Sequence, residues 1–358
     1  MKNYSVIIIG GGSIGTFTMY HLAKQGIENV LLIEKESQLG KGATGAWGSL
    51  IHTFHKDLET TRNAAQSISF FDNFKENVGQ SCHFNKTGSL YFLKKKDLHL
   101  FEQHFNAMKQ HSISFKILSA QEGKSLFPQF YWFEDDIAIY EPLAGTACPD
   151  TTTKSLVEFA TQHNCHLKLK TKVAQFISEG DSIKGVITES GEQLFAEKVI
   201  LAAGIWSHEL LPEVDTEFNI QKKKIQINRF IRNHTHAPEA PLFFDMSQRT
   251  FGHFFPNGSF AGGYLKSDLE EANLDHIHNL NISEANKAKQ KISLRLNWIK
   301  NAKLEGGIWG IENYTTESPK SIRLSKRYKN LLPVTGWNCA GFTTAPIIGE
   351  RIAKNILS

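Results

Sequence analysis

Three glycines near the start of the chain have the spacing of a phosphate-binding turn. Gly10, Gly12 and Gly15 follow an apolar run and precede a segment of helical pattern, and a second apolar run, Val30–Ile33, ends on Glu34. In a βαβ unit of this kind the first glycine allows a tight turn, the second lets the backbone approach a pyrophosphate, and the third lets helix and strand pack closely. Free N–H groups at the helix N-terminus attract the phosphates, and the acid can hold a ribose hydroxyl.

The same glycine spacing can occur by chance in any α/β protein. Here strand, glycines, helix, second strand and terminal acid occur in order, which favours a dinucleotide site. The first residues lead directly into the strand, without the basic start, longer apolar core and cleavage site of a secretory signal. No apolar run has the length of a membrane span. We therefore expect a soluble, cytoplasmic protein.

Charge and cysteine content argue against several other classes. Forty basic and thirty-six acidic side chains leave a net charge of +4. The basic clusters 94–96 and 222–224 are short, as in solvated loops or strand edges, and do not favour nucleic-acid binding. The four cysteines are scattered, without a CxxC pair or a His/Cys cluster at metal-ligand spacing. We expect a reducing compartment and no structural metal.

Apolar spacing gives a coarse map of the remaining chain. Helices are predicted at 58–78, around 98–108, from Ser119 with Glu122 as a capping box, at 150–164, at 284–300 and through Ile352 and Ile356. Strands are predicted at 88–93, at 182–188 with 193–197 as a hairpin, at 199–204, at 220–230, at 251–265 around a turn, and at 331–335. Residues 40–50 are too rich in glycine for a regular element, which indicates that something large lies against their backbone.

Four segments resemble the superfamily of FAD-dependent D-amino-acid oxidase, glycine oxidase and sarcosine oxidase, over nearly the whole chain. They are residues 10–34, the loop 42–48, the segment 199–207 and the tail 336–349, whose Gly-Phe-Thr-Thr-Ala-Pro is similar to a family turn. The resemblance implies an α/β fold: a Rossmann-like FAD-binding domain with an inserted, mostly antiparallel β-sheet substrate domain. The FAD-binding domain would comprise residues 1–80, 142–215 and 306–358, and the substrate domain residues 81–141 and 216–305.

The resemblance also implies where FAD lies. Adenosine is expected at Glu34, the pyrophosphate over 12–14, and the isoalloxazine between 44–49 and 338–344. The expected FAD-binding residues are Gly10, Gly12, Ser13, Ile14, Gly15, Glu34, Lys35, Ala43, Thr44, Gly45, Trp47, Gly48, Ser49, Leu50, Val173, Ala203, Gly204, Trp206, Asn338, Cys339, Gly341, Phe342, Thr343 and Thr344. The helix that begins after the turn 338–344 can direct N–H groups at the flavin N1 and C2 carbonyl. NAD is the competing dinucleotide, but it would not explain a C-terminal segment that closes a flavin site.

Non-covalent FAD is expected, although some relatives attach their flavin to a histidine or cysteine. Gly48 follows Trp47 where one such histidine would be, and Glu312 occupies the usual cysteine region. Cys339 lies near the predicted flavin turn, but a lone cysteine more often packs than reacts.

Three candidate catalytic residues depart from the family pattern. Glu312 stands where an arginine commonly anchors a substrate carboxylate, His253 stands where a tyrosine can be, and Thr343 occupies the place of a lysine of sarcosine-oxidase-like members. Two unit charges about 4 Å apart interact by roughly 4 kcal/mol at intermediate dielectric, so Glu312 would repel a carboxylate. We hypothesise an amine substrate, cationic or lacking an α-carboxylate, with Glu312 as its counter-charge.

Other roles for these residues stay open. Glu312 could be exposed or paired with Arg323, and His253 could be a polar anchor, a proton acceptor or a structural hydrogen-bond partner. His52 and His55 follow the predicted flavin loop and could face the ring or the substrate entrance.

The leading functional hypothesis is FAD-dependent oxidation of an amine or amino acid. A hydride would pass from the carbon next to nitrogen to flavin N5, the imine would hydrolyse, and oxygen or another acceptor would take the electrons. The alternatives are a dehydrogenase of a hydroxy acid or polyol, for which His253 could supply the base, and a flavoprotein subunit of a larger complex. A tRNA-modifying enzyme would call for a broader basic face than +4 provides. Substrate identity and oligomeric state stay open.

Overall fold

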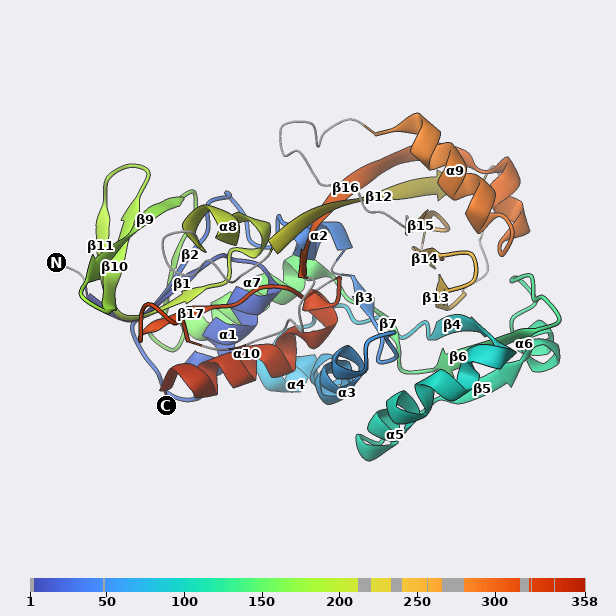
Figure 1. Ribbon diagram of the computed structural model, residues 1–358, viewed down its shortest axis with the longest axis horizontal. Helices are drawn as coiled ribbons and strands as arrows, with labels where there is room; N and C mark the ends of the chain where they lie inside the picture. The colour runs from blue at the N-terminus through green and yellow to red at the C-terminus, as the bar shows by residue number, and fades with distance from the viewer. Residues whose placement is uncertain are drawn as a thin grey trace.

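Two large β-sheets organise the chain, one on the left and one on the right of Figure 1. The structure is a computed structural model that describes residues 3–47, 49–211, 220–232, 240–255, 257–265, 280–315, 322, 324–337 and 339–357. The N-terminal strand and the C-terminal helix belong to the same half of the molecule, so the chain leaves this half and returns to it.

The first sheet has seven strands in the order β8-β2-β1-β11-β10-β9, with β17 also paired to β11. Their bounds are β1 (Asn3–Ile9), β2 (Val30–Ile33), β8 (His166–Lys168), β9 (Val173–Glu179), β10 (Ser182–Thr188), β11 (Gln193–Leu201) and β17 (Leu331–Pro333). Strands β8, β2, β1, β11 and β17 run parallel, and β9, β10 and β11 pair antiparallel. This arrangement places the ends of β1, β2 and β11 at one edge of the sheet, where α/β proteins bind their ligands.

The β1 strand is buried on both faces, which explains its unbroken apolar run. Val6 and Ile8 pack in the core formed with the helices, whereas Ile7 and Ile9 pack with β9, β10 and β11. The helices of this half are α1 (Ser13–Lys24), α3 (Leu58–Asp72), α4 (Phe74–Val78), α7 (Pro149–Thr161), α8 (Ser207–Leu210) and α10 (Gly341–Leu357). Helices α1 and α10 lie side by side, so the C-terminal segment covers the N-terminal βαβ unit (Figure 1).

The second sheet has eight strands in the order β16-β12-β15-β14-β13-β4-β6-β5. Their bounds are β4 (Ser89–Lys94), β5 (Lys116–Ser119), β6 (Asp136–Glu141), β12 (Ile220–Ile231), β13 (Leu242–Asp245), β14 (Thr250–Phe254), β15 (Phe260–Tyr264) and β16 (Lys303–Thr315). All neighbours are antiparallel except β13 and β4, so the expected mostly antiparallel sheet is confirmed. The β3 strand (Leu50–Ile51) pairs with β7 (Gly145–Thr146) in a separate two-stranded sheet.

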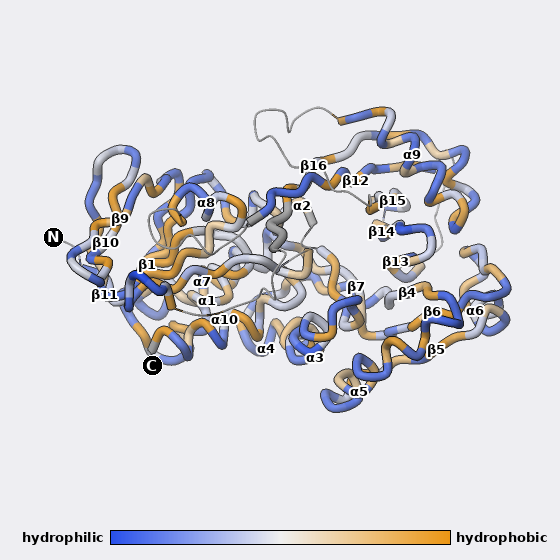
Figure 2. Tube along the Cα trace, in the orientation of Figure 1, coloured by the Kyte–Doolittle hydropathy of each residue, from blue (hydrophilic) through white to orange (hydrophobic). Residues whose placement is uncertain are grey.

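Short helices accompany the second sheet. They are η1 (Lys95–Phe101), α5 (Glu102–Gln110), α6 (Ala120–Leu126), α9 (Ile282–Ile292) and η5 (Asn297–Asn301). Figure 2 shows hydrophobic residues concentrated along the central strands of the first sheet, whereas α5 and α9 carry many hydrophilic residues. Among the described helices, none combines the length and apolarity needed to cross a membrane.

Several predicted elements differ from the structure in their bounds. The predicted helix 58–78 is broken at Asn73 into α3 and α4, and Asn73 itself donates its side-chain N–H to the Ser69 carbonyl. The predicted helix 284–300 ends at Ile292 and continues after a gap as η5. The predicted strands 193–197 and 199–204 are one strand, β11, whose first part pairs with β10 and whose last part pairs with β17.

The glycine-rich loop contains a regular element that the sequence analysis did not expect. Residues Ala43–Trp47 form the short helix α2. Gly45 permits this turn, because a Cβ at that position would overlap the Gly40 carbonyl. The predicted capping box at Ser119 and Glu122 is confirmed. β16 crosses the predicted domain boundary between residues 305 and 306, and the division into domains stays a prediction.

Candidate functional site

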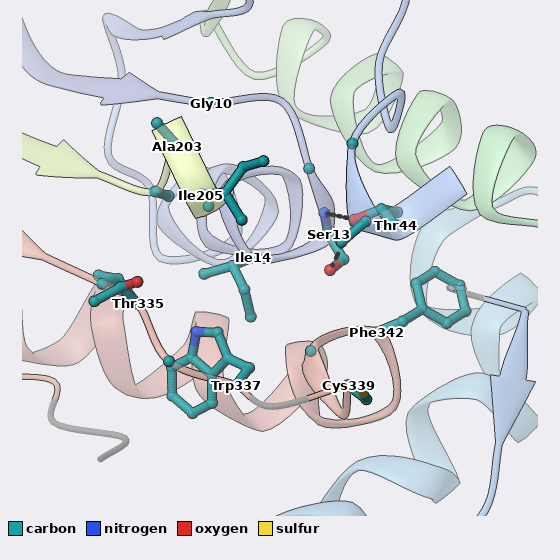
Figure 3. A pocket seen from close by; sticks show the side chains of 18 of the residues that line it. Gly10, Ser13, Ile14, Thr44, Ala203, Ile205, Thr335, Trp337, Cys339 and Phe342 are labelled. Atoms are coloured by element: carbon teal, nitrogen blue, oxygen red, sulfur yellow. Dashed lines mark hydrogen bonds between the residues drawn. The ribbon is translucent and has the colours of Figure 1, made fainter. Parts of the chain in front are cut away.

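A cavity of about 590 Å³ lies between the two halves, in the size range of small-molecule sites. It is lined by the β1–α1 turn, the end of β2, helix α2, the segment after β11 and the turn before α10, together with residues of β4, β13, β14 and β16. Figure 3 shows Ile14 and Trp337 facing each other across this space, with Ala203 and Ile205 on one side and Thr44 and Phe342 on the other.

The glycine turn fits the phosphate role predicted for it. Gly10 has φ +114°, and a Cβ there would overlap the Ala202 carbonyl oxygen. A Cβ on Gly15 would overlap the Gly10 carbonyl oxygen, so this glycine allows helix α1 to pack on β1. Gly12 is the N-cap of α1, and neither a side-chain cap nor an acidic residue occupies the first turn. The N-terminus of α1 therefore offers N–H groups and a positive potential to an anion.

Glu34 is buried at the next part of the cavity. Its Oε2 accepts the Gly11 N–H at 2.7 Å and its Oε1 accepts the Glu36 N–H at 2.9 Å. These bonds fix the carboxylate beside the glycine turn and leave it acceptor capacity for a ribose hydroxyl. The Lys35 ammonium lies 3.8 Å from the centroid of the Trp206 ring, and both side chains line the cavity.

Helix α2 is attached to the glycine turn by a hydroxyl. The Ser13 N–H donates to Thr44 Oγ1 at 2.9 Å, the dashed line of Figure 3. A Cβ on Gly12 would lie 3.3 Å from the same oxygen, so the turn and α2 come close together. A large ligand over the glycine turn would therefore also contact α2, as the sequence analysis expected of this loop.

The structure brings most of the expected FAD-binding residues into this one cavity. Those that line it are Gly10, Gly12, Ser13, Ile14, Glu34, Lys35, Ala43, Thr44, Leu50, Val173, Ala203, Gly204, Trp206, Cys339, Gly341, Phe342 and Thr343. Gly15, Gly45, Ser49 and Thr344 are not among the lining residues; the two glycines act through close packing, and the Thr344 hydroxyl donates to the Ala340 carbonyl. Gly48, Asn338 and the Trp47 side chain lie outside the part that the structure describes.

Several lining residues were missed by the sequence analysis. They include Lys56, Asp57, Thr60, Tyr91, Thr171, Lys172, Glu209, Phe244, Phe251, Leu265, Ile311, Thr335 and Trp337. Thr171 and Lys172 could have been predicted from the sequence, since they directly precede Val173, which was an expected FAD-binding residue. The aromatic residues could not, because an aromatic side chain in a strand gives the same signal whether it faces a core or a ligand.

The end of the cavity nearest the second sheet is walled by aromatic and imidazole rings. The His52 ring lies 4.3 Å from the Phe244 centroid and 4.1 Å from the His55 centroid, and Tyr91 lies 5.8 Å from Phe244. Burial lowers the pKa of His52 from 6.5 to about 4, so this ring is neutral near neutral pH. Burial also raises the pKa of Tyr91, whose hydroxyl donates to the Met246 sulfur. This end is therefore lined by aromatic rings and by the neutral imidazole of His52.

The three catalytic candidates differ in their relation to the cavity. Thr343 lines it and is buried; its Oγ1 accepts the His52 N–H at 3.3 Å. His253 is not a lining residue, although Phe251 of the same strand is; its ring contacts Phe255, and burial lowers its pKa to about 4. The backbone of Glu312 belongs to β16 opposite Lys223, and its side chain lies outside the described part. The catalytic roles of all three stay predictions.

The glycine turn, the buried acid and the cavity at the edge of a parallel sheet define a dinucleotide-binding protein. The model of the family of FAD-dependent oxidoreductases matches residues 5–355, and the chain belongs to this family. The predicted family, fold class and FAD cofactor are confirmed.

Relatives and solved structures agree with this assignment. The chain is 28% identical over 205 residues to mitochondrial dimethylglycine dehydrogenase of Rattus norvegicus, covering 57% of this chain and 24% of that protein. It is 22% identical to 4-methylaminobutanoate oxidase (formaldehyde-forming) of Paenarthrobacter nicotinovorans, covering 98% of this chain and 43% of that protein. The chain thus spans less than half the length of these two relatives. L-proline dehydrogenase from P. horikoshii has the same fold, with a TM-score of 0.89 and 22% identity over 99% of this chain and 93% of that one.

Proposed function

We propose that the protein oxidises a carbon–nitrogen bond of an amine or amino acid. The observation that carries the proposal is one continuous cavity that joins the dinucleotide cradle to an end walled by His52, Tyr91 and Phe244. Bound FAD would supply the acceptor for the hydride that leaves the carbon next to nitrogen. Two relatives support the class, since their names state oxidation of dimethylglycine and of 4-methylaminobutanoate, both N-methylated amines.

The walls of the cavity suit an organic cation or amine better than a bare carboxylate. Aromatic faces attract ammonium groups and exclude water. Among the described lining residues, the lysines are Lys35, Lys56 and Lys172, and there is no arginine. Lys35 lies against Trp206 at the predicted adenosine end, Lys172 is paired with Glu189 and Glu209, and Lys56 is exposed. The described aromatic end thus holds no buried lysine or arginine for an α-carboxylate, which favours an amine that lacks one.

Glu312 completes this proposal as the counter-charge of a cationic substrate. Its backbone directly follows Ile311, which lines the cavity. A carboxylate near the substrate would favour an ammonium and disfavour an anion, by a few kcal/mol at about 4 Å.

The location and assembly of the protein belong to the same proposal. All four cysteines are free, which supports a reducing compartment such as the cytoplasm. We also propose that the protein forms an oligomer or binds a partner subunit. The molecular mass and subunit composition of the purified native protein test this assembly. The electron acceptor is oxygen or another oxidant.

Anaerobic reduction of the FAD-loaded protein tests the proposed function. A panel of N-methylated amines, simple amines, D- and L-amino acids and hydroxy acids is added, and the loss of flavin absorbance near 450 nm, roughly where oxidised flavins absorb, is followed. Bleaching by an amine supports the proposal, and recovery of the colour in air distinguishes an oxidase from a dehydrogenase. Bleaching by hydroxy acids alone would instead support the alternative with His253 as base.

A further inference from the structure

The buried imidazole of His52 lies at the aromatic end of the cavity, directly beside Thr343 of helix α10. We propose that His52 is a substrate-binding residue whose Nε2 accepts a hydrogen bond from the substrate N–H, and that Glu141 is the positioning residue that holds it in this orientation. The inference rests on the proposed amine oxidation. It specifies how the site would distinguish a substrate nitrogen that carries a hydrogen from one that does not.

The hydrogen bond at the other ring nitrogen determines which tautomer His52 adopts. Its Nδ1 lies 2.9 Å from the carbonyl oxygen of Phe54. A carbonyl oxygen only accepts, so Nδ1 must carry the hydrogen. Because burial lowers the pKa of His52 to about 4, the ring is neutral near pH 7 and has only that one N–H. The Nε2 atom therefore has a free lone pair, and none of the hydrogen bonds of His52 to described residues uses it.

The ring is held on several sides before any ligand binds. Phe244 from β13 and His55 flank it with centroids 4.3 Å and 4.1 Å away. Its backbone N–H donates to Thr343 Oγ1 at 3.3 Å. The second sheet and the C-terminal helix thus both fix His52, and an acceptor that is already oriented loses little entropy when it binds a ligand.

Glu141 fixes the peptide that orients the ring. This last residue of β6 is 1% exposed. Its Oε2 accepts the Thr53 N–H and its Oε1 accepts the Phe54 N–H, each at 2.9 Å, and Ser89 Oγ donates to Oε1 at 3.4 Å. Burial raises the pKa of Glu141, and no cation of the described chain is paired with it. A buried carboxyl group is costly, and here its two oxygens hold the backbone whose carbonyl binds His52.

A free lone pair on Nε2 would favour ligands that carry a hydrogen on nitrogen. An amine or ammonium N–H donates to Nε2, whereas a carboxylate has only acceptors and would face the lone pair unfavourably. A quaternary ammonium has the same charge but no N–H. The proposed bond therefore distinguishes dimethylammonium from tetramethylammonium.

The ratio of the affinities for these two cations measures the contribution of His52. Binding of each chloride salt to the FAD-loaded protein is followed anaerobically by the shift of the flavin spectrum. In His52→Asn the shorter amide can still donate to the Phe54 carbonyl, but no acceptor remains at Nε2. We expect the preference for dimethylammonium to fall by about tenfold to a hundredfold, the range for a hydrogen bond that involves a charge. An unchanged preference would overturn the proposal.

His163→Asn is the matched control. The Nδ1 atom of His163 also bonds a carbonyl, that of Phe159 at 2.8 Å, but this residue is exposed and does not line the cavity. The control should keep the wild-type preference. If wild-type protein is bleached by amines while His52→Asn keeps the preference, only the role of His52 fails. If no amine bleaches or binds the wild type, the proposed function and this inference both fail.

A second measurement tests the positioning role without relying on turnover. In the ¹⁵N-histidine-labelled, FAD-loaded protein at pH 7, the signal that is lost in His52→Asn should show a protonated Nδ1 and an unprotonated Nε2. In Glu141→Gln, the side-chain NH₂ replaces one acceptor, and we expect a shifted His52 signal together with a reduced preference for dimethylammonium. A charged His52 ring or the opposite tautomer in the wild type would overturn the proposal, and an unshifted signal in Glu141→Gln would remove the role of Glu141.

Discussion

His21 should make the stability of this protein depend on pH between about 6.5 and 4. This residue of α1 is 9% exposed, and its ring lies 5.0 Å from that of Tyr20. Burial lowers the pKa of His21 from 6.5 to about 4, although Glu350 opposes the shift; Lys24 and Lys354 act in the same direction as burial. The folded state therefore prefers the neutral ring, and the unfolded chain binds a proton at higher pH than the folded protein does.

The size of the effect follows from the shift. A lowering of about 2.5 pKa units corresponds to about 3.4 kcal/mol between the two protonation states. Since the folded pKa is depressed, this stabilisation is present above pH 6.5 and is lost as the pH falls towards 4. At pH 5 the loss from His21 alone amounts to about 2 kcal/mol relative to pH 7.5.

His21→Gln provides the test, because glutamine does not titrate. The free energy of unfolding of the apoprotein is measured in guanidinium chloride at pH 7.5 and at pH 5. The loss between these pH values should be about 2 kcal/mol smaller in the variant than in the wild type. His111→Gln, at an exposed position, is the control and should follow the wild type. An equal loss in His21→Gln and the wild type would refute the reasoning.

The remaining predictions concern the cofactor, the core and the substrate. Gly15→Ala should abolish FAD binding, seen as loss of flavin absorbance, since its Cβ would overlap backbone; Gly306→Ala, where a Cβ meets nothing within 4 Å, should retain FAD. Arg295→Leu should lower the unfolding free energy by about 3–5 kcal/mol, because buried Asp245 loses its cation and buried Asp136 keeps only Lys94; an unchanged melting temperature would contradict this. Glu312→Gln should raise the Michaelis constant of a cationic substrate. Acid precipitation should release FAD from the polypeptide, and flavin that stays bound would contradict non-covalent attachment.

Local sequence determined the elements whose contacts lie close together in the chain. The β1–α1–β2 unit follows from an apolar run, three spaced glycines and a terminal acid. Gly15 is required by the Gly10 carbonyl within the unit, whereas a Cβ on Gly10 would overlap the carbonyl of Ala202, which is distant in sequence. The capping box at Ser119 and the β10–β11 hairpin are local in the same sense. These patterns also predicted FAD, and most of the residues expected to bind it line the one cavity.

Only the tertiary structure decided what surrounds the substrate end. The His52 N–H donates to Thr343, which is 291 residues further along the chain, and the Thr53 N–H donates to Glu141, which is 88 residues further along. No periodic pattern links such positions, because hydrophobic periodicity reports which face of an element is buried and not which distant element covers it. The sequence alone thus predicted the dinucleotide cradle, whereas long-range packing decided which distant segments surround His52.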